Sequence, residues 1–88
     1  MTRAEVLAWL HSRRPAPPPT LRERLRSAVH DAPGGLAVHL ACLGQELLDR
    51  VTSQPSGGRE LALDLLAADA FATYAFEAQA EEGPIHET

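Results

Sequence analysis

A long segment without glycine or proline in the second half of the sequence constrains the fold more than any other feature. Residues 59–82 contain no helix breaker, and Gly83 followed by Pro84 is typical of the end of a helix. We therefore predict one helix over residues 59–82, which at about 1.5 Å per residue would be about 36 Å long. In a chain of 88 residues, a helix of that length has to be the spine of the domain.

Apolar side chains occur on every side of this predicted helix. The first stripe at helical spacing consists of Leu61, Leu65, Ala68, Ala72 and Phe76. A second set occupies the other sides, and its members include Leu66, Ala70, Phe71 and Tyr74. A helix that is apolar all round is usually buried from more than one direction. Because one short chain can hardly cover both sides, we predict that the second set forms an interface with a second copy or with another helical protein.

Two shorter helices are predicted near the N-terminus, over residues 3–13 and 20–30. Each begins with a capping box, in which a threonine hydroxyl and a glutamate satisfy the first free N–H groups of a helix. The two capping boxes are Thr2-x-x-Glu5 and Thr20-x-x-Glu23. Between the helices, the prolines of residues 15–19 remove backbone donors and favour an extended conformation, which indicates a stiff spacer.

A further helix is predicted over residues 36–52, where leucines recur at helical spacing. The glycine- and proline-rich segments 31–35 and 53–58 should form turns on either side of it. The fold class is therefore all-α, a small four-helix bundle with two short N-terminal and two longer C-terminal helices. Residues 1–83 would form one helical domain, followed by a frayed tail at 84–88. A chain this short has a limited core, so dimerisation would help to complete it.

Charge is divided unevenly along the chain, whose net charge is −4. Residues 1–30 carry six arginines against two glutamates, whereas residues 31–88 carry two arginines against ten acidic residues. Three of those acids, Glu77, Glu81 and Glu82, fall at the C-terminal end of the long helix, where the helix dipole disfavours negative charge. We expect basic groups of the first helix, or of a second subunit, to offset them.

Asp69 is a carboxylate in the middle of the apolar part of the long helix. A buried unpaired carboxylate would cost several kcal/mol, so Asp69 should be paired, protonated or exposed. We interpret it as a structural ion pair with an arginine of the second helix, and this pair would fix the register of the two helices. The candidate arginines are Arg22, Arg24 and Arg26. Exposure and a role in ligand binding are the alternatives.

His39, Cys42 and Glu46 are spaced so that an imidazole, a thiol and a carboxylate fall on adjacent turns of one helix. Three such side chains could converge on a metal ion, with His30 as a fourth ligand. Zinc motifs normally bring a second close pair of ligands, and the chain has only one cysteine. A solvated polar face therefore accounts better for these residues, and we expect no cofactor.

Binding is a better expectation than catalysis for this sequence. It contains no nucleophile elbow, no phosphate loop and no Glu-x-x-His pair of a di-iron bundle. Arginines 13, 14, 22, 24 and 26 could bind nucleic-acid phosphates, but the overall acidity and the absence of lysine argue against that partner. We predict a non-catalytic protein-interaction module that forms a homodimer, with metal or small-ligand binding and nucleic-acid association as alternatives.

The expected location is the cytoplasm. Cys42 is the sole cysteine, which rules out an internal disulfide and suits a reducing compartment. Arg3 and Glu5 interrupt any signal-peptide pattern, and no apolar run approaches the length of about 20 residues that a membrane span needs. No membrane association is therefore expected.

Overall fold

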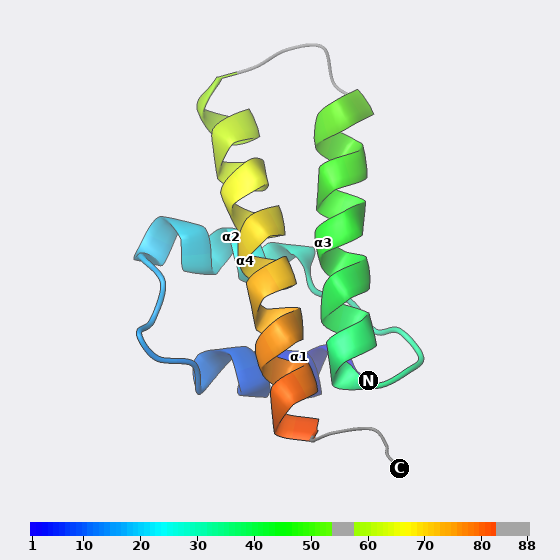
Figure 1. The fold of residues 1–88 in the computed structure, drawn as a ribbon. Coiled ribbons are helices and arrows are strands. Elements are labelled where there is room, and N and C mark those ends of the chain that lie inside the picture. Colours follow the sequence, from blue (N-terminus) through cyan, green and yellow to red (C-terminus); the bar gives the residue numbers. More distant parts are fainter. Residues whose placement is uncertain (54–57, 83–88) are drawn as a thin grey trace.

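The computed structural model describes residues 1–53 and 58–82, which contain four helices and no strand (Figure 1). The helices are α1 (Arg3–His11), α2 (Pro19–Ala28), α3 (Leu36–Ser53) and α4 (Arg59–Glu82). The predicted all-α class is confirmed, with two short helices followed by two longer ones. The frayed tail predicted at 84–88 and most of the turn predicted at 53–58 lie outside the described residues.

The predicted boundaries of the long helices hold to within one residue. Helix α4 has 24 residues and begins and ends where the breakers placed it. At the start of α1 the capping box is formed: the Thr2 N–H donates to Glu5 Oε1 at 2.8 Å, and the Glu5 N–H donates to Thr2 Oγ1 at 3.2 Å. None of the described helices combines the length and the apolar character that crossing a membrane requires.

The start of α2 differs from the prediction. Its N-cap is Pro18, its first helical residue is Pro19, and no side chain caps it. The predicted capping box of Thr20 and Glu23 is therefore wrong. Proline suits the first helical position because its φ is fixed near the helical value and its missing N–H would have no partner there. The prolines thus start the helix before Thr20 can act as a cap.

Helices α3 and α4 form an antiparallel pair whose backbones approach closely at Gly44 (Figure 1). A Cβ atom placed on Gly44 would lie 3.2 Å from the carbonyl oxygen of Ala68 and 3.2 Å from the Cβ of Phe71. Phe71 is fully buried at this crossing, together with Leu40 and Leu43 of α3. The closest part of the helix pair is therefore also the centre of the hydrophobic core.

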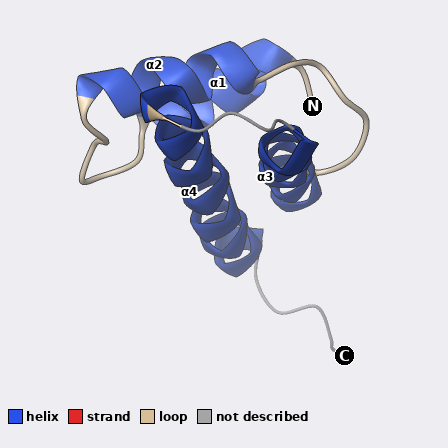
Figure 2. Ribbon diagram, turned by 90° about the horizontal axis from the view of Figure 1, so that it is seen from above, coloured by secondary structure: helices blue, strands red, loops and turns tan. Residues whose placement is uncertain are grey.

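The two short helices lie across one face of the α3–α4 pair (Figure 2). Val6 of α1 and Leu25 of α2 insert into the core, and Val29 follows them just after α2 ends. Both short helices therefore cover the same side of the long pair, instead of running along α4 end to end. Among residues 1–53 and 58–82, no helix covers the opposite side of α3 and α4.

Replacing Gly44 with leucine should destabilise the fold by about 3 kcal/mol, because the added side chain would push against the backbone of α4 and overpack the core. Chemical denaturation followed by circular dichroism measures this change. Cys42→Leu is the matched control, since Cys42 is exposed on the same helix. A Gly44→Leu protein as stable as Cys42→Leu would show that α3 and α4 do not approach as closely as described.

Candidate functional site

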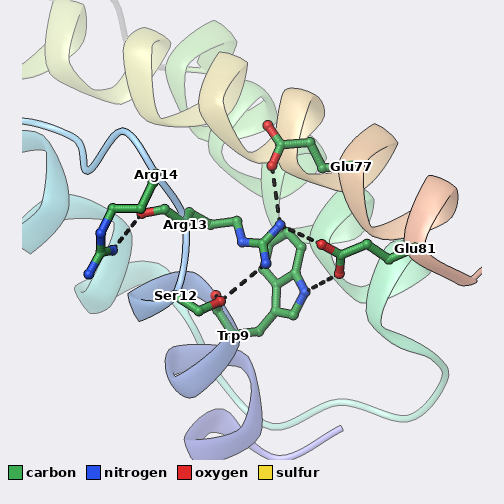
Figure 3. Close-up of polar contacts among 6 residues, drawn as sticks. All are labelled: Trp9, Ser12, Arg13, Arg14, Glu77 and Glu81. Carbon is green, nitrogen blue, oxygen red and sulfur yellow. Dashed lines mark hydrogen bonds and ion pairs between the residues drawn. The ribbon is translucent and has the colours of Figure 1, made fainter.

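The acidic C-terminal end of α4 is neutralised by residues of the first helical segment (Figure 3). The Arg13 guanidinium lies 2.7 Å from Glu81 Oε2 and 3.5 Å from Glu77 Oε1. Trp9 Nε1 donates to the other oxygen of Glu81 at 2.8 Å, and the Arg13 guanidinium stacks 4.0 Å from the centre of the indole ring. The expectation that the first helix offsets these carboxylates is confirmed for Glu77 and Glu81.

These contacts shift the proton affinities of both partners. The hydrogen bond from Trp9, followed by that from Arg13, holds the pKa of the Glu81 carboxyl below its usual range. The same carboxylate raises the pKa of Arg13. Glu82 of the same turn accepts a hydrogen bond from the backbone N–H of Ala37 at 3.4 Å. Donors of this chain thus reach all three carboxylates, with Arg13 supplying the positive charge, and these contacts give no support for a second subunit.

The indole hydrogen bond should make stability depend on pH in the acid range. A carboxyl group whose pKa is lowered by folding stabilises the native state above its unfolded pKa of about 4.5, and this contribution is lost as the pH falls through the folded value. Trp9→Phe should therefore raise the pKa of Glu81 in a carbon-13 NMR titration. The stability difference from the wild type should be largest near neutral pH and shrink in acid. An unchanged Glu81 titration would contradict the contact.

The ion pair between α2 and α4 joins Arg24 to Asp64. Arg24 Nε donates to Asp64 Oδ1, and Asp64 is 8% exposed. Asp69 is exposed and forms no ion pair in the described part of the chain, while Arg26 pairs with Glu23 of its own helix at 3.3 Å. The predicted pairing of Asp69 with Arg22, Arg24 or Arg26 is therefore wrong, and the alternative of an exposed Asp69 is confirmed. Asp64 and Asp69 lie about 140° apart around α4, so only Asp64 faces α2.

Asp64→Asn should destabilise the fold by about 2 kcal/mol, because it leaves the Arg24 guanidinium in a partly buried position without its carboxylate. Asp69→Asn is the matched control and should change the free energy of unfolding by less than about 0.5 kcal/mol. Thermal and urea denaturation of the two variants test this difference. Equal losses for both variants would mean that the register of α2 on α4 is not set by Asp64.

The predicted interface residues of α4 lie mostly in the interior of the chain. Phe71 is fully buried, and Ala70 and Tyr74 pack against the core. Tyr74 meets Trp9 edge to face, with ring centres 5.9 Å apart. Leu66 is the exception and is 56% exposed. The interface prediction is wrong for Phe71, because this side chain is buried at the crossing of α3 and α4.

The candidate metal ligands do not converge. His39 is 1% exposed, whereas Cys42 and Glu46 are exposed. Glu46 instead pairs with His30, whose Nε2 lies 2.8 Å from Glu46 Oε1, and the His30 ring packs 5.9 Å from that of His39. The pKa of His30 is raised, mainly through the Asp31 carbonyl and then through Glu46. Nowhere in residues 1–53 and 58–82 do three His, Cys, Asp or Glu side chains gather in a way that could hold a metal ion.

The prediction of His39 on a solvated face is also wrong. The segment that connects α2 to α3 carries His30 over the start of α3 and covers the His39 ring. Both ring nitrogens of His39 are buried and have no hydrogen-bond partner among the described residues. A histidine at this position behaves as a packing residue of the core.

A shallow apolar groove of about 670 Å³ runs between α3 and α4, and its lining residues come from these two helices alone. Small residues line it on both helices: Ala37, Ala41, Gly44, Ala68, Ala72 and Ala75. Larger apolar side chains, which are 40–80% exposed, also line it: Val38, Leu48, Leu65 and Phe76. We call this surface the α3–α4 groove. It lies on the side of the helix pair that α1 and α2 leave uncovered.

Polar side chains are few in the α3–α4 groove. They are Gln45 of α3 with Asp69 and Gln79 of α4, so Asp69 is the one charged residue of the lining. Because Gly44 meets Ala68, the neighbouring Gln45 and Asp69 lie at about the same level along the two helices. The Asp69 carboxylate, which lies in the apolar part of the long helix, is therefore on an exposed surface.

The apolar stripes of α4 are visible in the sequence, but the stripe that faces solvent differs from the predicted one. Leu65, Ala72 and Phe76 belong to the first apolar stripe of the long helix, and Leu65 and Phe76 are exposed. Phe71, assigned to the partner-facing set, is buried. On α3, Val38 and Leu48 also line the groove, and no site is predicted at these two residues from sequence.

Comparison with known proteins adds no relative. No family model matches the chain, and no curated protein or solved structure matches it either.

Proposed function

We propose that this protein is a small, non-catalytic interaction module that forms a homodimer through the α3–α4 groove. One observation carries the proposal: of the five exposed large apolar side chains in the described residues, four line this groove. An apolar patch gathered on one face of a small protein usually marks an interaction site. The apolar surplus of the long helix, expected from sequence, would then be used on this face.

A second copy fits the shape of the groove. Its lining combines small side chains near the centre, such as Ala41 and Ala72, with large ones toward the ends, such as Leu65 and Phe76. When two such surfaces meet across a two-fold axis, the large side chains of one copy can insert over the small ones of the other. Two α3–α4 pairs stacked in this way form a four-helix core, with α1 and α2 of each copy on the outside.

The polar residues of the groove suit the same arrangement. One amide N–H of Gln45 donates to Asp49 Oδ1 of its own helix at 2.9 Å, which leaves its second N–H as a donor, and Asp69 supplies a carboxylate that can accept it. In a dimer, Gln45 of one copy would donate to Asp69 of the other. A polar pair inside an apolar interface adds little affinity, but it selects one register over its neighbours.

The expected affinity is moderate. Full burial of an apolar side chain contributes about 1.5–3 kcal/mol, and the four large groove residues are only partly exposed before association. Association itself costs about 4–15 kcal/mol. A dissociation constant between millimolar and micromolar requires the gain over two copies to exceed this cost by about 4 to 8 kcal/mol, and we expect an affinity in that range. Cys42 is exposed and free, which suits the proposed cytoplasmic location.

Two adjacent leucines of α4 provide a matched test. Leu65 is 45% exposed and lines the groove, while Leu66 is 56% exposed and does not. Leu65→Glu should abolish dimerisation in sedimentation equilibrium, because it places a charge on the apolar interface. Leu66→Glu should dimerise like the wild type, and both variants should keep their helical circular dichroism.

Two results would contradict the proposal. One is a wild-type protein that stays monomeric up to millimolar concentration, which would leave the groove to a different helical protein. The other is a dimer that survives Leu65→Glu but is lost in Leu66→Glu. That result would place the interface on the side of α4 predicted from sequence.

A further inference from the structure

A second cleft lies on the other side of the molecule, between α1, the proline-rich connection and α2. Its volume is about 800 Å³, within the range of small-molecule sites. The apolar part of its lining includes Leu7 and Leu10 of α1, Leu25 of α2 and Tyr74 of α4. The prolines that separate the two short helices hold them apart, and the cleft occupies the space between them.

Arginines gather in this cleft, and none of its lining residues in the described part of the chain is acidic. The basic lining residues are His11, Arg13, Arg14, Arg22 and Arg26. This concentration of positive charge stands out on a chain whose net charge is −4. The lining thus combines apolar side chains with basic ones.

The arginines differ in how far their guanidinium groups are already engaged. Arg13 is bound to Glu77 and Glu81, and Arg26 is paired with Glu23. Arg14 donates to the backbone carbonyls of His11 and Arg13, at 2.9 and 2.7 Å. The Arg22 side chain has no ion pair and no hydrogen bond in the described part of the chain. Arg22 therefore has its whole set of donors available for a ligand.

We propose that this cleft binds an amphipathic oxyanion, a small molecule with an apolar body and a carboxylate or phosphate head. The apolar body lies against Leu7, Leu10 and Tyr74. The head binds the Arg22 guanidinium, which can hold a carboxylate or a phosphate through two parallel hydrogen bonds. Arg14 and Arg26 add positive charge beside it.

The lining favours such a ligand over a nucleic acid. Proteins that bind single strands combine an open cationic track with several aromatic rings on which bases stack. Here the positive charge is confined to a concave site, and Tyr74 is the sole aromatic residue of the lining. The nucleic-acid alternative raised by the sequence therefore has less support than a small amphipathic anion.

The cleft and the α3–α4 groove share no lining residue. Ligand binding in the cleft is thus independent of the proposed dimer, and either proposal can fail alone.

The test is isothermal titration calorimetry with four probes: decyl phosphate, decanoate, decanol and inorganic phosphate, each kept below its micelle concentration. Decyl phosphate or decanoate should bind at least about tenfold more tightly than decanol or inorganic phosphate, because only they engage both the apolar and the basic side chains. The ratio of the first two affinities identifies the preferred head group. Backbone amide shifts in NMR should change at Leu7 and Leu10.

Arg22→Gln should weaken the binding of the preferred amphiphile about tenfold. Arg50→Gln on α3 is the matched control, since Arg50 is exposed and lies outside the cleft, and it should bind like the wild type. The proposal is overturned if neither amphiphile binds at millimolar concentration, if Arg22→Gln has no effect, or if the shifts fall on the α3–α4 groove. Tighter Arg22-dependent binding of a single-stranded oligonucleotide would also overturn it.

Discussion

The close approach of α3 and α4 at Gly44 is the constraint on which the rest of the structure depends. With no side chain at this position, Phe71 can fill the crossing and the two long helices share one continuous core. A two-helix layer has two faces, and the short helices α1 and α2 are long enough to cover only one of them. The uncovered face keeps its small residues at the centre and its large apolar residues exposed. The groove is thus the face of the α3–α4 pair that α1 and α2 do not cover.

The covering layer is held in place by two polar connections at different heights of α4. Arg24 reaches Asp64 in the first half of the helix, and Trp9 with Arg13 reaches Glu81 in its last turns. These contacts join basic residues of the first third of the sequence to acidic residues of the last helix. The unequal distribution of charge along the sequence is therefore used for contacts within the fold. The same contacts leave some arginines of the α1–α2 layer without carboxylates, and Arg22 is the clearest case. The same layer that completes the core therefore carries the cationic cleft.

The extent of the two long helices and the start of α1 could be predicted from sequence, whereas the ends of α1 and α2 and the direction in which each helix face points could not. Breakers at Gly83 and Pro84 and the capping box at Thr2 are local signals, and α4 and the start of α1 follow them. For a helix that is apolar all round, however, periodicity does not tell which stripe meets the rest of the chain. For this reason Phe71, predicted at an interface, is buried, whereas Leu65 of the other stripe is exposed. The same limit explains why the ion pair was predicted at Asp69 and not at Asp64, and why His39 was predicted on an exposed face. Both outcomes depend on how the helices cross.

The central claim is that the α3–α4 groove joins two copies of the chain. An isotope-filtered nuclear Overhauser experiment on a mixture of labelled and unlabelled protein tests it most directly, because only contacts between two molecules give a signal. For the proposed dimer, we expect intermolecular contacts from the Phe76 ring and the Leu65 methyl groups to alanines in the groove of the other copy. Intermolecular contacts that involve Leu66 in place of these residues, or none at millimolar concentration, would contradict it.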